Sequence, residues 1–470
     1  MRSSKNIRKN TTKEKYSKFS FLKGAAWIAT GGFVAKLIGA LYRIPLTNLI
    51  GGHGMGLYQM VYPVYCLLLT VSATGIPSSI AKLTAERIGK NKPTQPLFKT
   101  ALRLFLIIGG VGSVLMAVIA PYLSKAQGSE EVLWGYYTLA PSVFLVSAIS
   151  VFRGYFQGRN EMYPTALSEI TEQAVKVGFG LFFAKMYRGN VGKAVVFLLL
   201  AVSLSELAAL LLMMFLYKRR KKRDKKRLIK EESQTDNAKA QREQKDRVSA
   251  KTVLRLSIPV TFSSILLPLS GLLDSVLAPR LMSAYAEDAV ALFGLFSGGA
   301  VTIINLPVSV CYGIAAASVP AVASAKKPRK KIFFSLWITL LVAIPSVVGL
   351  YFFAEPAAKI IFRSLTGAEL QILTKLVKIF SVSALTLSCV QTLSACLTAQ
   401  GKPHLAAISM LIAVTVKTLV YQTLLKNADI SVFGLAYATN ICYLVAFLLD
   451  LLYNLRVSRI PKRKRQQSED

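Results

Sequence analysis

The sequence predicts an all-α, polytopic membrane protein with about 12 transmembrane helices in two lobes of six helices each. Three observations support this fold class. Of the 470 residues, 53% are hydrophobic and only 17% are charged, and the mean hydropathy is +0.46, whereas soluble chains of this length carry more charge. The apolar residues form long runs, and the basic residues collect between alternate runs.

Each apolar run is long enough to cross a membrane as a helix. A helix rises about 1.5 Å per residue and must cross about 30 Å of hydrocarbon. The runs of this length lie near 21–46, 55–77, 100–124, 133–156, 162–186, 191–217, 253–280, 289–320, 331–354, 370–399, 404–425 and 430–455. Six runs precede the long polar segment 218–251 and six follow it, so this segment predicts a boundary between two lobes.

Short matches between the halves predict an internal duplication. Ser168 and Lys176 of the fifth run recur at the same spacing as Ser409 and Lys417 of the eleventh. Because six is an even number of spans, the halves have the same orientation and form a parallel repeat. The predicted segments are a basic cytoplasmic N-terminus (1–20), an N-lobe (21–217), a basic inter-lobe loop (218–251), a C-lobe (252–455) and a basic C-terminal tail (456–470).

The placement of the basic residues predicts the orientation of the chain. Most of the 58 Lys and Arg residues lie in the termini, in the inter-lobe loop, and in the shorter segments 82–103, 153–161 and 325–331. By the positive-inside rule, both termini are cytoplasmic and the chain crosses the cytoplasmic membrane. The net charge of +35 therefore indicates contact with membrane lipids, with no nucleic acid as partner.

Charged side chains within the spans are candidate functional residues, because an ionised group at mid-membrane costs about 2.5 to 3.5 kcal/mol on insertion scales. In the first span, Lys36 and Arg43 share one helical face with Gly32 and Gly39. This face is cationic and uncrowded. It predicts contact with a phosphate or carboxylate of a substrate.

The fifth span carries a polar stripe formed by Thr165, Glu169, Glu172, Gln173 and Lys176. These residues recur at helical spacing, so they share a face that must lie against protein or water rather than lipid. Glu172 and Lys176 are four positions apart in the order that favours an ion pair, so part of the stripe can neutralise itself. We expect the stripe to handle a substrate or a coupling ion.

Three further charges lie in other spans. Asp274 is in the seventh span, and Lys417 in the eleventh occupies the position that Lys176 occupies in the first half. The sequence is consistent with an ion pair of Asp274 with either Lys417 or Lys36. Glu206 in the sixth span is isolated, and it is interpreted equally well as a packed carboxyl or as a functional group.

The sequence argues against an enzyme. Its two histidines and five cysteines show no spacing typical of a metal or catalytic site, and no Gly-rich phosphate loop is followed by Lys and Ser/Thr. No catalytic residue, metal or cofactor is therefore predicted. We expect the energy for transport to come from an ion gradient or from the membrane potential, which supplies about 2.3 kcal/mol per charge per 100 mV.

Three stretches of the chain resemble the stage V sporulation protein B and polysaccharide biosynthesis family. They are YRIPL from Tyr42 to Leu46, GMGLYQM from Gly54 to Met60 and, most specifically, FRGYFQG from Phe152 to Gly158. The family belongs to a superfamily that also contains multidrug and toxin extrusion (MATE) transporters and lipid II flippases. The resemblance covers the whole chain and implies a V-shaped, two-lobed fold that works by alternating access.

The resemblance also implies a cargo and a site. The cargo is an undecaprenyl-pyrophosphate-linked saccharide, such as lipid II, moved to the outer leaflet for assembly of peptidoglycan, spore cortex or polysaccharide, in contact with the cell-wall or spore-cortex synthesis machinery. In related flippases, basic residues of the first helix meet the pyrophosphate. This chain has no basic residue in 55–77 or 289–320, where those relatives have others.

The expected site therefore has two parts. The residues expected to bind the anionic headgroup are Lys36, Arg43, Lys176 and Lys417. The residues expected to hold a coupling ion, H⁺ or Na⁺, or to line the cavity are Glu169, Glu172, Gln173 and Asp274.

Two alternatives remain open on the sequence. A cation-coupled exporter of drugs or other small molecules would use an acidic, aromatic-lined cavity, which Glu169, Glu172 and Asp274 favour and the basic first span opposes. A membrane scaffold for envelope assembly would use the basic loop as its docking site. Deletion of 222–245 separates the scaffold from a transporter, because a transporter should survive that loss.

Overall fold

The computed structural model describes residues 2–71, 75–90, 92–232, 250–323, 325, 328–365 and 367–459. These residues are almost entirely helical and contain no strand. The elements in chain order are α1 (Arg2–Leu69), α2 (Gly75–Gly89), α3 (Gln95–Gln127), η2 (Glu130–Val132), α4 (Leu133–Gly158), α5 (Tyr163–Met186), α6 (Val191–Glu232), α7 (Ala250–Met282), α8 (Ala289–Gly294), η3 (Leu295–Ala300), α9 (Val301–Ala323), α10 (Pro328–Phe352), α11 (Ala354–Ile361), α12 (Gly367–Ala399), α13 (Pro403–Leu424) and α14 (Phe433–Arg459).

Nine of the described helices are long and apolar enough to cross a membrane. Seven of them lie within single elements, namely α3, α6, α7, α10, α12, α13 and α14, and the other two combine η2 with α4 and α8 with η3 and α9. α5 is not among these nine, because Glu169, Glu172 and Lys176 interrupt its apolar sequence. The all-helical membrane fold is thus confirmed, while the count of twelve spans stays a prediction.

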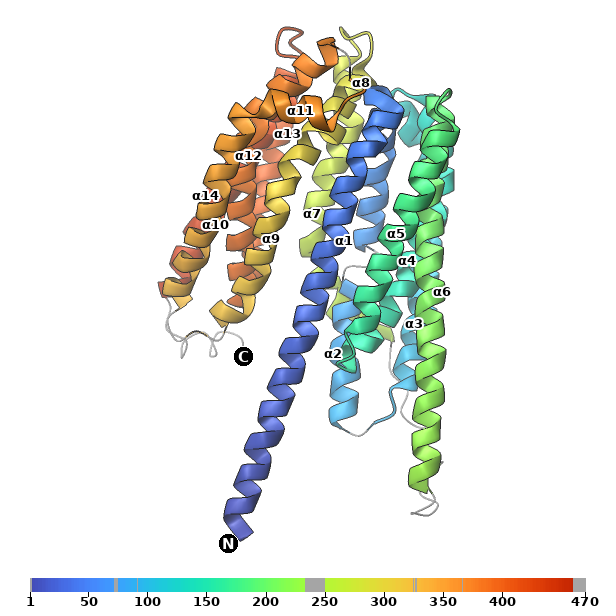
Figure 1. Ribbon diagram of the computed structural model, residues 1–470, viewed down its shortest axis with the longest axis vertical. Coiled ribbons are helices and arrows are strands. Elements are labelled where there is room, and N and C mark those ends of the chain that lie inside the picture. Colours follow the sequence, from blue (N-terminus) through green and yellow to red (C-terminus); the bar gives the residue numbers. More distant parts are fainter. Residues whose placement is uncertain are drawn as a thin grey trace.

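α1 contains the first predicted span and most of the second. Gly51, at φ 69° and ψ −174°, interrupts its helical geometry, and glycine adopts this positive φ without the steric penalty that other residues meet. The chain turns back at this point, so that the second limb runs beside the first (Figure 1). The break therefore separates two spans at the position that the sequence left between 46 and 55.

The helices of the second half repeat the packing scheme of the first. In the first half α1 packs on α5, α5 on α6, α4 on α6, α3 on α4 and α2 on α4. The second half contains the same set of contacts with α7, α9, α10, α12, α13 and α14 in the places of α1 to α6. This correspondence is what a parallel duplication requires.

The two halves meet where α1 breaks and where α8 begins. An added Cβ at Gly56 would overlap the carbonyl oxygen of Val290, and one at Gly294 would overlap the carbonyl oxygen of Gly52. Small residues allow helix backbones to approach this closely in membranes. Gln59 adds a hydrogen bond from its Nε2 to the carbonyl oxygen of Ser297, at 3.0 Å. We call this part of the molecule the α1–α8 end.

The halves diverge away from the α1–α8 end. Figure 1 shows α9, α10, α12 and α14 separating from α1 toward the end of the molecule where the first turn of α1 lies. α7 follows a different course, because it packs on α2 and α3 of the first half as well as on α13 of its own. The first and seventh helices thus carry most of the contact between the halves.

Several helices extend into segments that the sequence assigned to loops. α2 ends at Gly89 and α3 begins at Gln95, so little of the predicted loop 82–103 is non-helical. α6 likewise continues to Glu232 inside the predicted loop 218–251. Hydropathy marks the edge of the apolar run, whereas Lys, Arg and Glu favour continuation of a helix. The remainder of that loop, 233–249, and residues 460–470 of the tail lie outside the described chain.

Candidate functional site

A buried group of charges joins α4 and α5 in the first half. Arg153 on α4 donates from Nε to Ser168 Oγ at 2.9 Å and from Nη2 to Glu172 Oε2 at 3.1 Å. The Arg153 and Glu172 side chains are only 15% and 19% exposed. The sequence placed Arg153 in the cytoplasmic segment 153–161. In the structure this residue is helical, because α4 continues to Gly158, and its guanidinium is largely buried against α5.

The polar stripe of α5 lies in this group. Thr165 and Lys176 are buried, Glu169, Glu172 and Gln173 are partly buried, and Gln173 Nε2 donates to Glu172 Oε1 at 3.2 Å. The expectation that the stripe faces protein or water is therefore consistent with the structure. The hydrogen-bonded cation beside Glu172 is Arg153 of another helix, rather than the Lys176 that helical spacing suggested.

Glu206 of α6 completes the group. It is 3% exposed, and its Oε1 accepts a hydrogen bond from the Tyr65 hydroxyl at 3.0 Å. Among the described residues, its Oε2 has no hydrogen-bond partner. A buried polar atom without a partner is unfavourable, so this oxygen marks a place where a proton or another cation would be stabilised. The charges of Glu206, Glu172 and Arg43 all act on Lys176.

The two basic residues of the first span differ in what the structure describes. The backbone of Lys36 is part of α1, but its side chain lies outside the described structure. Arg43 is partly buried on α1, and α1 packs on α5. An added Cβ at Gly39 would lie 3.2 Å from Gln173 Oε1, so the space that Gly39 leaves is used for packing between these helices.

The second half contains a buried ion pair between α7 and α13. Lys417 Nζ lies 2.5 Å from Asp274 Oδ2, with the two side chains 4% and 14% exposed. Lys417 also donates to Ser270 Oγ at 3.2 Å. Of the two pairings that the sequence allowed, the structure contains the one with Lys417. Its charge is neutralised in this conformation, while Asp274 Oδ1 has no hydrogen-bond partner among the described residues.

The candidate residues thus form two groups, one in each half. The N-lobe group contains Arg43, Arg153, Lys176, Glu172 and Glu206, and the C-lobe group is the pair of Asp274 and Lys417. Sequence reasoning missed Arg153 and Tyr65, because their partners lie on other helices. The FRGYFQG stretch that contains Arg153 was the available signal. The described residues contain no cluster of three His, Cys, Asp or Glu side chains suited to a metal ion.

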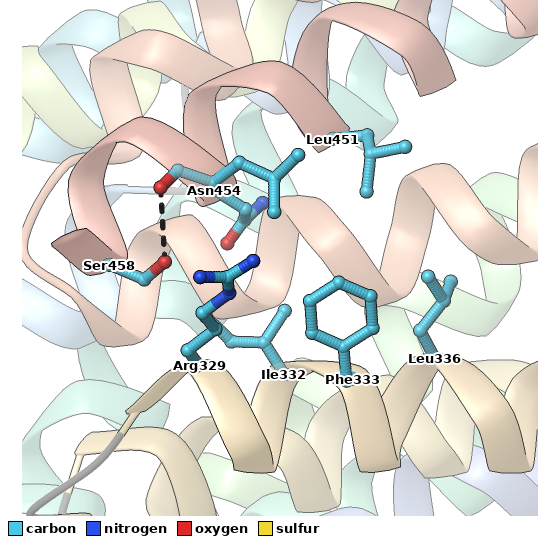
Figure 2. Close-up of a pocket in the computed structure, with 8 residues that line it drawn as sticks. Arg329, Ile332, Phe333, Leu336, Leu451, Asn454 and Ser458 are labelled. Carbon is cyan, nitrogen blue, oxygen red and sulfur yellow. Dashed lines mark hydrogen bonds between the residues drawn. The ribbon is translucent and has the colours of Figure 1, made fainter.

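A small pocket elsewhere in the second half is too small for a solute. It lies between α10 and α14, where Arg329 extends toward Asn454 and Ser458, and Ser458 Oγ donates to the carbonyl oxygen of Leu455 (Figure 2). Its volume is about 10 Å³, close to the minimum that holds one water molecule. This pocket is a packing gap rather than a transport site.

Comparison with known proteins identifies the family to which this chain belongs. The model of the polysaccharide biosynthesis protein family matches residues 21–326. Stage V sporulation protein B of Bacillus subtilis (strain 168) is 25% identical over 461 residues, covering 94% of this chain and 85% of that protein. Lipid II flippase MurJ of the same strain is 21% identical over 459 residues, covering 92% and 82%.

The fold is also similar to a solved structure. An inward-facing multidrug resistance MATE family transporter of the MOP superfamily superposes with a TM-score of 0.70 at 16% identity, covering 90% of this chain and 95% of that one. The expected MATE-like architecture is confirmed, and so is the resemblance to the stage V sporulation protein B and polysaccharide biosynthesis family. The chain belongs to the polysaccharide biosynthesis protein family.

Proposed function

We propose that this protein is a flippase that moves an undecaprenyl-pyrophosphate-linked saccharide from the inner to the outer leaflet of the cytoplasmic membrane. The multi-pass fold and the flippase and transporter relatives support transport across a membrane. The positive-inside rule supports an orientation in which the α1–α8 end is outermost and the end with the first turn of α1 is cytoplasmic. The diverging helices then open toward the cytoplasm, where the cargo is made.

One observation supports an anionic cargo above the alternatives. Each half holds a buried lysine, Lys176 on α5 and Lys417 on α13, at corresponding positions of the repeat. Arg43 is partly buried on α1, which packs on α5, the helix that carries Lys176. A diphosphate that approaches between the lobes would therefore meet cations from both sides once Asp274 releases Lys417, while the prenyl tail stays in lipid. Lys36 is the fourth proposed contact.

Coupling to an ion belongs to the same proposal. Glu169, Glu172, Gln173 and Asp274 are the proposed cavity and coupling residues, and Glu206 joins them because of its unpartnered oxygen. Protonation of such a carboxylate removes a charge that would otherwise hold a lysine or arginine. A proton, or Na⁺ in its place, can thereby release a basic side chain for the cargo phosphates. Cell-wall or spore-cortex synthesis enzymes are the proposed consumers of the product.

Charge reversal at Arg43 tests the anionic site. We expect Arg43→Glu to abolish complementation of a flippase-depleted strain, because the variant repels a diphosphate, while membrane levels stay normal. Lys185→Glu is the matched control, since Lys185 is an exposed residue at the far end of α5. Full complementation by Arg43→Glu would remove this residue from the mechanism.

A reconstituted assay distinguishes the cargo classes. Proteoliposomes should translocate labelled lipid II or another undecaprenyl-linked glycan, and the comparison of the two identifies the saccharide. Transport of a cationic drug without transport of either lipid would instead establish the small-molecule exporter.

A further inference from the structure

A pocket separate from the charged groups opens at the α1–α8 end. Its volume is about 430 Å³, which is within the range of small-molecule sites. One wall is the last turn of α3 and the residue after it, and the other is formed by the end of α7 and the start of α8. Its lining residues include Tyr122, Lys125, Gln127, Arg280, Ser283 and Val290. The pocket therefore spans the junction of the two halves.

Two basic side chains from opposite halves converge on this pocket. Lys125 lies on the last turn of α3 and Arg280 on the last turn of α7, and both are exposed. No carboxylate lines the pocket, and neither cation forms an ion pair within the described part of the chain. The nearby Asp288 is already engaged, since it contacts His53 at 2.8 Å and accepts from the Ala291 amide.

The position of these cations requires a local explanation. Basic residues are disfavoured at the outer face of a membrane protein. The negative end of a helix dipole favours one cation at each helix terminus, but it does not explain why two such cations line one pocket. Tyr122, 75% exposed beside them, is the type of residue that marks the level of lipid headgroups.

We propose that this pocket binds the headgroup phosphate of an anionic phospholipid in the outer leaflet. Lys125 and Arg280 neutralise the phosphate and donate hydrogen bonds to it, while the Ser283 hydroxyl donates to the carbonyl oxygen of Arg280 at 2.8 Å. Gln127, which also lines the pocket, connects its two walls, because its Nε2 donates to Ser275 Oγ on α7 at 3.3 Å. Since both halves line the pocket, a bound lipid holds them together and favours the conformation with a closed α1–α8 end. This proposal rests on the proposed orientation of the chain in the membrane, but it does not depend on which cargo the protein transports.

Lipid binding by the full-length protein tests this inference. Phosphatidylglycerol is titrated onto the purified protein, and native mass spectrometry measures its affinity beside that of phosphatidylcholine. One basic residue near an anionic lipid changes affinity by about fivefold. We expect the Lys125→Gln/Arg280→Gln variant to bind phosphatidylglycerol about 30-fold more weakly than the wild type, and each single variant to lose about fivefold. Phosphatidylcholine affinity should not change.

The control removes the same charge from the same face of the membrane. Lys185→Gln/Lys193→Gln changes two exposed lysines at the junction of α5 and α6, away from the pocket, and should retain wild-type affinity. Equal affinity in both double variants would overturn the proposal. Displacement of the lipid by an equal concentration of inorganic phosphate would also overturn it, because the free ion would then be the ligand. The readout is independent of transport, so failure of the flippase proposal leaves this test intact.

Discussion

At the scale of single residues, the molecule neutralises its intramembrane charges in pairs drawn from different helices. Arg153 with Glu172 connects the consecutive helices α4 and α5, and Lys417 with Asp274 connects α13 to α7, 143 positions earlier in the chain. Such pairs add little net stability compared with apolar residues, but removal of one partner is strongly destabilising. Their presence in the membrane interior is therefore better explained by function than by stability.

The Lys417 and Asp274 pair gives a prediction at this scale. Lys417→Met leaves Asp274 buried without its cation, and we expect a loss of about 3 to 5 kcal/mol of stability. Adding Asp274→Asn removes the stranded charge and should restore most of the loss. Thermal unfolding of the purified variants, followed by size-exclusion chromatography, measures both effects.

The double variant also separates function from folding. If Lys417 contacts the cargo, the Lys417→Met/Asp274→Asn variant should still fail to complement a flippase-depleted strain, although its stability is restored. Complementation by this variant would show that the pair is purely structural. A single Lys417→Met variant as stable as the wild type would contradict the contact itself.

At the scale of elements, the glycines of the second limb of α1 set how closely the halves approach. Gly56 faces the backbone of α8 so closely that no Cβ fits there. Because the obstruction is a carbonyl oxygen of the backbone, α8 itself must move to accommodate a side chain. Gly178 on α5 has no atom within 4 Å of an added Cβ, and it therefore offers a matched control.

We expect Gly56→Ala to separate the halves at the α1–α8 end. Spin labels on Glu130 and Glu287, both exposed at this end, should report a longer or broader distance distribution by pulsed electron resonance. Gly178→Ala should leave the distribution unchanged. An unaltered distance in Gly56→Ala would contradict the role of close packing in holding this end shut.

At the scale of the whole molecule, the long α6 is attached to the first half by an ionic network beyond the apolar core. Arg220 Nη2 lies 2.9 Å from Glu161 Oε1, and Arg159 Nη2 lies 3.0 Å from Asp224 Oδ2. The broad deletion of 222–245 would remove Asp224 together with the loop. The structure therefore favours a deletion that begins after α6 ends at Glu232.

Deletion of 233–245 tests the scaffold alternative without damage to this network. A flippase should retain complementation, because its helices and charged groups remain, whereas a docking protein should lose activity. The companion variant Asp224→Ala with the loop intact measures the contribution of the network by itself. Loss of complementation only in the loop deletion, at normal membrane levels, would favour the scaffold.

The sequence by itself determined the helical class, most of the apolar spans and the residues that form the charged stripe of α5. Apolar length and helical periodicity are local properties, so residues within one segment reveal them. It also proposed the pairing of Asp274 with a lysine, but left two candidates. The sequence did not show that α6 continues to Glu232 inside the predicted loop 218–251, because hydropathy indicates where the hydrocarbon-spanning segment ends and not where the helix ends.

Only the tertiary structure decided which polar and charged side chains pair with one another. Tyr65 reaches Glu206 and Arg153 reaches Glu172 because α4, α5, α6 and the second limb of α1 pack in one bundle. Contacts between helices depend on rotation and register, which sequence spacing along one helix does not encode. The same reason explains the pocket at Lys125 and Arg280, since two helix ends from opposite halves come together only in the folded molecule.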